Sequence, residues 1–195
     1  MHRSLPSLRA SVRRGLTLTE GLLFLAIAAL VIVAAVFLYN NIQGSRANND
    51  ALTQINSYTS GMKSMYSSQS TYGTASLVEA AINGGVAPRN AVRGAGLINP
   101  WGGPTTIEGL TNAFYVRMED VPQDACVRML TAGLLTQGSI FAIRAGAAAS
   151  TEAAPTSSSA SAGNGAFVAT EPPTPADAAS VCSDGATNVM TFYVR

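Results

Sequence analysis

The sequence contains only one histidine, His2, which lies in a short basic segment at the start of the chain. Histidine is the most frequent general base in enzymes and the most frequent metal ligand. If residues 1–15 are removed, Ser–His and Cys–His nucleophile systems and histidine zinc sites are excluded. An enzyme based on lysine or carboxylate chemistry is left open, but we expect no enzyme, no cofactor and no metal site.

Charged residues are also scarce, at 12% of the 195 residues, compared with about 25% in ordinary soluble domains. The net charge of +1 gives no reason to expect a nucleic-acid partner. Arg3, Arg9, Arg13 and Arg14 precede residue 15 without any acidic residue among them. Without that segment, eight basic side chains would face eleven acidic ones, a net charge of −3. The 47% apolar content is enough for one modest domain with a core.

A long apolar run follows the basic segment, and residues 21–38 carry no charge. Counted from Leu16, the run is long enough to cross a bilayer as a helix, which takes about 20 residues. The preceding arginines place the N-terminus in the cytoplasm. An ordinary secretory signal has a shorter apolar stretch of about 7–15 residues and a small-residue cleavage site. A plain signal anchor fits the hydropathy equally well, but it gives no reason for Glu20.

Glu20 stands at the edge of the apolar run, where a carboxylate is costly. Insertion scales give about 2.5–3.5 kcal/mol at the bilayer centre and less near the interface. Cleavage between Gly15 and Leu16 would create an amino group four residues before Glu20. The amine of one subunit and the carboxylate of a neighbour would neutralise each other inside an apolar bundle, where each alone is an unpaired charge.

Gly15, Leu16, Glu20 and the following apolar helix resemble the class III signal of type IV prepilins. The resemblance implies that a prepilin peptidase cuts after Gly15 and N-methylates Leu16, and that Glu20, the fifth mature residue, is needed for assembly. The leader is long and the first mature residue is leucine rather than phenylalanine, features similar to the IVb subclass. The implied partners are further copies of the chain in a helical filament, the peptidase, the assembly machinery and the inner membrane.

The helical pattern continues beyond the apolar run as an amphipathic stripe. Its residues recur at spacings of three and four, and no proline occurs between Pro6 and Pro88. We predict a helix over residues 16–70, with a membrane and assembly half at 16–40 and an amphipathic half at 41–70. Such a helix resembles a pilin stalk that enters its own head domain. The stripe comprises Leu52, Ile55, Tyr58 or Thr59, Met62 and Met65.

Residues 71–195 read as a small α+β head with an antiparallel sheet, although the strand order cannot be read from the sequence. We expect loop-rich structure at 84–104, where glycine and proline are frequent, and a surface loop at the low-complexity stretch 146–180. The loop is a candidate variable and glycosylated face. The remaining predicted elements are helices at 74–82 and 122–135 and strands at 112–118, 139–144 and 188–194.

Two short segments in the head add to the resemblance. The turn Asn99-Pro100-Trp101-Gly102-Gly103 and the segment 121–126 are similar to structural pilins of thin conjugative pili. From the residues alone, the turn is a rigid corner with one aromatic side chain packed inward.

Cys126 and Cys182 are the only cysteines. Both follow the apolar segment, in a compartment expected to be oxidising, where an even pair is read as a disulfide. The alternative, a reactive thiol, lacks a histidine to activate it. The bond would close the low-complexity stretch into a loop, and pilins of the resembled family carry a similar C-terminal disulfide loop.

The sequence therefore predicts a structural protein: a single-pass inner-membrane precursor that becomes a subunit of an extracellular type IVb pilus. Such a filament serves adhesion, aggregation or conjugative contact. A minor pilin or a secretion-system pseudopilin shares the same N-terminal pattern and remains an alternative. A signal-anchored exported domain that binds a ligand or hydrolyses a substrate is the alternative from another class.

Overall fold

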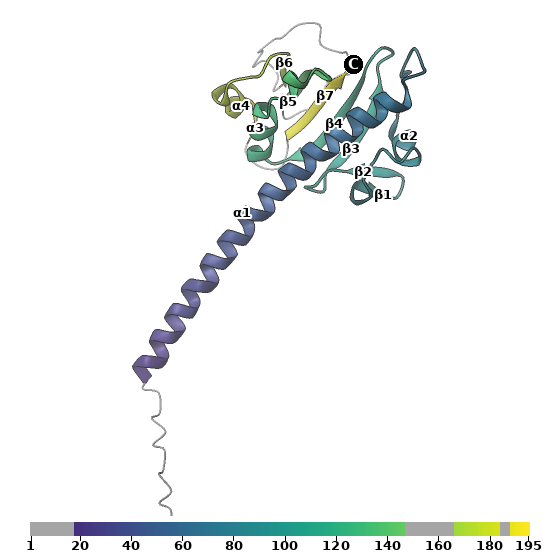
Figure 1. Cartoon of the computed structure of the whole chain (residues 1–195). Helices are drawn as coiled ribbons and strands as arrows, with labels where there is room; N and C mark the ends of the chain where they lie inside the picture. The colour runs from purple at the N-terminus through teal and green to yellow at the C-terminus, as the bar shows by residue number, and fades with distance from the viewer. Residues whose placement is uncertain (1–17, 147–165, 184–187) are drawn as a thin grey trace, which may run out of the picture. The chain divides into compact units, whose positions relative to one another are not determined.

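The computed structural model describes residues 18–146, 166–183 and 188–195 (Figure 1). Gly15 and Leu16 lie outside the described residues, as do residues 147–165 of the low-complexity stretch. The chain divides into two units, residues 1–42 and residues 43–195, and each is considered by itself. Helix α1 (Leu18–Met65) contributes residues to both.

In the first unit, α1 is apolar on every side. Leu22, Leu23, Phe24 and Leu25 are consecutive, so they point in four directions around the helix, and each is more than 60% exposed. The helix is long and apolar enough to cross a membrane. A helix that is apolar all round is buried in its working environment, either in lipid or among other helices.

The second unit is an α+β head built on a seven-stranded antiparallel sheet. The order of the strands across the sheet is β1-β2-β3-β4-β7-β5-β6. The bounds are β1 Val92–Arg93, β2 Gly96–Ile98, β3 Pro104–Gly109, β4 Phe114–Val121, β5 Ile140–Gly146, β6 Ala166–Ala169 and β7 Asn188–Val194. The C-terminal strand β7 therefore lies in the interior of the sheet, between β4 and β5.

Short helices lie before and between these strands. They are α2 (Val78–Asn83), α3 (Gln123–Thr131) and α4 (Pro175–Val181), with 3-10 turns η1 (Arg89–Ala91) and η2 (Leu134–Gln137). α3 and α4 pack against each other, and α3 also contacts β5 and β7. The long helix, antiparallel sheet and short helices confirm the fold class expected from the sequence.

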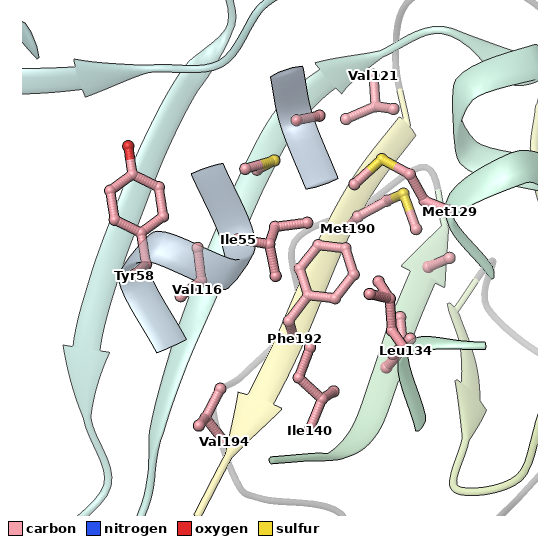
Figure 2. Close-up of a cluster of buried hydrophobic side chains, with 14 of the residues drawn as sticks. Ile55, Tyr58, Val116, Val121, Met129, Leu134, Ile140, Met190, Phe192 and Val194 are labelled. Atoms are coloured by element: carbon pink, nitrogen blue, oxygen red, sulfur yellow. The ribbon is translucent and has the colours of Figure 1, made fainter. Parts of the chain in front are cut away.

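The core of the head lies between α1 and the sheet (Figure 2). Ala51, Ile55, Tyr58 and Met62 follow one another at helical spacing and are fully buried, which confirms the central part of the predicted stripe. The facing strand β7 alternates as a strand should, with Met190, Phe192 and Val194 in the same core. Several further buried side chains are shared with α3, β4 and β5, namely Phe114, Val116, Met118, Met129, Leu130 and Ile143.

Several predicted bounds were wrong, each for a local reason. The helix predicted at 74–82 begins only at Val78, because Ser76 forms an antiparallel bridge with Glu108 and Leu77 N donates to Ile107 O at 2.7 Å. The helix predicted at 122–135 ends at Thr131, because Gly133 takes a left-handed conformation with φ of 69°.

Two segments expected to be loops contain regular structure. The glycine-rich stretch 84–104 holds η1, β1 and β2. Within 146–180, the described residues include β6, which pairs with β5, and most of α4. Thr174 caps α4, its Oγ1 accepting from Asp177 N at 3.2 Å, and Pro175 occupies the first turn. Thr174 and Pro175 are helix-start residues, but the stretch was interpreted as a loop because it is rich in alanine, serine and proline.

The buried side chain of Tyr58 leads to a prediction about the stability of the head at alkaline pH. Its hydroxyl is buried without a hydrogen-bond partner among the described residues, and burial raises the pKa of the phenol from 10.0 to about 12. Because the unfolded chain ionises first, the contribution of Tyr58 to stability should be constant below pH 10 and should fall by about 2 kcal/mol as pH rises from 10 to 12.

The substitution Tyr58→Phe should remove that part of the alkaline loss. It should leave stability at pH 7 unchanged or raise it by up to about 1 kcal/mol, because it deletes an unpaired buried hydroxyl. Guanidinium unfolding at a series of pH values measures both effects.

Candidate functional site

The first candidate site is the exposed apolar surface of α1 in the N-terminal unit. Its large side chains are between 50% and 82% exposed. Glu20 lies in the first turn of the described helix and is itself exposed. A carboxylate in this turn is favoured by the partial positive charge of the helix N-terminus, and it is the acidic side chain of an otherwise apolar surface.

The second candidate feature is the disulfide between Cys126 and Cys182. The Sγ atoms are 2.01 Å apart, the Cα atoms are 6.0 Å apart, and the two residues are separated by 56 positions. Cys126 lies on the buried face of α3, and Cys182 follows the last residue of α4. Gln123 on α3 donates from Nε2 to Cys182 O at 3.0 Å, so the same two helices are joined twice. The predicted bond is confirmed.

Asn188 forms a buried junction beside the disulfide. Its Nδ2 donates to Val121 O and to Ser183 O, both at 3.0 Å, and its Oδ1 accepts from Ser183 N at 2.8 Å. The side chain is fully buried, so these bonds replace those to water. Asn188 therefore ties the end of β4, the segment after Cys182 and the start of β7. The sequence analysis identified Asn188 only as the first residue of a predicted strand.

Asn99 organises the turn that the sequence singled out. Its Oδ1 accepts from Trp101 N and from Gly103 N, both at 3.0 Å, and its Nδ2 donates to Glu119 O on β4. Gly103 is required there, because a Cβ at this position would lie 2.1 Å from Glu119 O. Trp101 packs against the core while remaining partly exposed, so the predicted rigid corner is present.

The described residues contain no candidate metal site. There is no group of three or more His, Cys, Asp or Glu side chains placed to hold a metal ion in that part of the chain. The two features built by the fold are an exposed apolar helix and a cross-linked head.

Comparison with known proteins identifies the family. The family model described as PilS N terminal matches residues 45–194. The chain belongs to the PilS family. The match covers the head and the part of α1 that packs on it.

Two solved structures with a similar fold agree with this assignment. The crystal structure of a type IV b pilin from Salmonella typhi matches with a TM-score of 0.53 and 22% identity, covering 73% of this chain and 95% of the other. TcpA, a type IV pilin from Vibrio cholerae El Tor biotype, matches with a TM-score of 0.51 and 17% identity, covering 77% and 99%. The head and α1 therefore have the type IV pilin fold.

Two curated relatives match over most of the chain. Both are described as the major structural subunit of bundle-forming pilus, from Escherichia coli O111:H- and from Escherichia coli O127:H6. Each is 25% identical over 190 residues, covering 93% of this chain and 94% of the relative. A PilS-family chain with the type IV pilin fold is a structural pilin rather than an enzyme.

Proposed function

We propose that this pilin is the subunit of a type IVb pilus, made as a precursor that a prepilin peptidase cuts between Gly15 and Leu16. Residues 16–40 hold the precursor in the inner membrane, with the N-terminus in the cytoplasm. After cleavage the assembly machinery transfers this segment from lipid into the core of a filament. Residues 71–195 form the head that the filament exposes outside the cell, where it serves adhesion, aggregation or conjugative contact.

The exposed apolar surface of α1 is the main support for this proposal. Residues 18–42 of α1 present large apolar side chains in every direction, and the chain belongs to a pilin family. At about 25 cal/mol per Å² of apolar surface removed from water, such a helix is stable only in lipid or in a bundle of like helices. A membrane precursor and a filament core supply these two environments in turn.

Glu20 sets the register of the bundle in this proposal. The amine of Leu16 in one subunit pairs with the Glu20 carboxylate of a neighbour, so that opposite charges meet inside the apolar bundle and neutralise each other. The first basic side chain after Leu16 is Arg46, far along the sequence, so the new amine is the positive charge available near Glu20.

Electron microscopy of a deletion strain tests the proposal. The strain without this chain should lack a class of filament that the wild type bears, and expression of the full-length chain should restore it. Immunogold labelling of the restored filaments along their length identifies a main subunit. Filaments in normal number on the deletion strain would refute the proposal.

Processing gives a separate prediction. Replacing Gly15 by a bulky residue, as in Gly15→Leu, should leave the full-length precursor in the membrane and abolish filaments. Immunoblotting of membrane fractions separates precursor from mature protein. Arg13→Leu, which places the same leucine side chain two residues earlier, should still be processed. A mature-sized product from Gly15→Leu would contradict the assigned cleavage site.

A further inference from the structure

A polar pocket of about 500 Å³ opens on the head beside the Asn99 turn. Its walls come from the part of α1 that belongs to the head, from the end of η1 and β1, and from the turn itself. The pocket lining includes two arginines, one acid, several amides and one aromatic ring, among them Arg46, Arg93, Asp50, Gln54 and Trp101.

Three of the side chains that line this pocket lack partners among the described residues. Gln54 is only 3% exposed, and its Oε1 accepts no hydrogen bond from the residues that the structure describes. A buried acceptor of this kind costs about 1–3 kcal/mol unless a donor arrives. Arg46 and Arg93 are exposed, and neither forms an ion pair within the described ranges. A ligand that carries a carboxylate for the arginines and a backbone N–H group for Gln54 would therefore complement this pocket.

A segment with this chemistry lies at the opposite edge of the same head. The pocket borders β1 and β2, which stand at one end of the sheet, whereas Glu171 follows β6, the strand at the other end (Figure 1). Residues 171–177 read Glu-Pro-Pro-Thr-Pro-Ala-Asp and are exposed except for partly buried Pro173. Asp177 already accepts a hydrogen bond from Thr174 Oγ1 at 2.6 Å, so Glu171 is the carboxylate of the segment that has no partner among the described residues.

The position of these two surfaces matters because of how filaments grow. A filament requires a heterologous contact, in which one surface of a subunit meets a different surface of the next. Complementary surfaces on opposite edges of one head satisfy that requirement. The three prolines fix much of the segment's backbone in advance, which lowers the entropy lost on docking, and proline-rich segments dock on aromatic side chains such as Trp101.

We propose that the segment 171–177 of one subunit docks in this pocket of a second copy of the chain. Glu171 pairs with Arg93 and Arg46, the prolines lie against Trp101, and a backbone N–H of the segment satisfies Gln54. The proposal rests on the filament function proposed above and names a contact between heads within the filament.

Charge reversal tests the contact. Arg93→Glu alone and Glu171→Arg alone should each reduce the sheared filament yield about tenfold, because each places like charges together in a contact that excludes water. The double variant should recover to within about twofold of wild type. Arg89→Glu, at an exposed arginine that does not line the pocket, is the matched control and should leave the yield unchanged. Formation of the Cys126–Cys182 bond, seen as a mobility shift on non-reducing gels, verifies that each head has folded.

A cross-link reports the contact directly. In Arg93→Lys filaments, a carbodiimide should join residue 93 of one chain to residue 171 of another, and peptide mapping of the covalent dimer identifies the link. Wild-type yield from both single reversals, no recovery in the double variant, or dimers linked elsewhere would each overturn the contact while leaving the filament function intact. If wild-type cells produced no filaments that contain this chain, the proposed filament function itself would be refuted.

Discussion

A Glu20→Val subunit is expected to be cleaved and to remain in the membrane, yet to form few or no filaments. The substitution removes the carboxylate and leaves the amine of Leu16 unpaired among apolar helices. Breaking a buried pair in this way costs about 3–5 kcal/mol, which corresponds to a hundredfold or greater loss in each addition step. Electron microscopy and the yield of sheared protein measure the loss, while immunoblotting of membranes measures processing.

Two further variants separate charge from size and from local helix effects. Glu20→Gln keeps the shape and a hydrogen-bonding group but not the charge, and should assemble almost as poorly as Glu20→Val. Thr19→Val changes a neighbouring polar residue without touching the carboxylate, and should assemble normally. If the segment were only a membrane anchor, removing a charge would improve insertion and harm nothing. Normal filament number from Glu20→Val would therefore refute the pairing.

Loss of the disulfide should produce the second large effect, on the stability of the head. The bond closes a span of 56 positions, for which the chain-entropy relation gives about 4 kcal/mol. Cys126→Ser or Cys182→Ser should lower the free energy of unfolding by about that amount. Guanidinium unfolding of the full chain in detergent, followed by fluorescence of Trp101, the single tryptophan, measures it.

Reduction provides the control for this measurement. Wild type treated with a reductant should lose the same stability as the serine variants, and the Cys126→Ser/Cys182→Ser double variant should be insensitive to the reductant. Gln123 and Asn188 still join the same segments by hydrogen bonds, so the reduced head should remain folded in mild conditions. A reduced wild type that is as stable as the oxidised protein would contradict the stabilising role of the bond.

The parts of the fold that the sequence predicted are those fixed by local pattern. The spacing of Ile55, Tyr58 and Met62 specified the buried face of α1, because helical periodicity is a property of neighbouring residues. The predicted strand 188–194 matches β7 residue for residue, since its apolar and β-branched residues leave no other reading. The disulfide followed from there being two cysteines in an exported segment.

The parts that the sequence did not predict depend on distant partners. β1 and β2 contain two and three residues, too few to show a period, and exist because they pair with each other and with β3. The place of β7 between β4 and β5 depends on long-range register that no local pattern encodes. The pocket beside Trp101 likewise brings together α1, β1 and a turn that are far apart in the sequence.

The intact mass of the protein in sheared filaments tests the central claim most directly. We predict a subunit that begins at Leu16, carries one added methyl group at its N-terminus and has the mass of a chain with Cys126 and Cys182 oxidised. This mass would show that one and the same chain is processed, assembled into filaments and cross-linked in its head. Filaments that contain none of this chain, or that contain it with residues 1–15 still attached, would contradict the account.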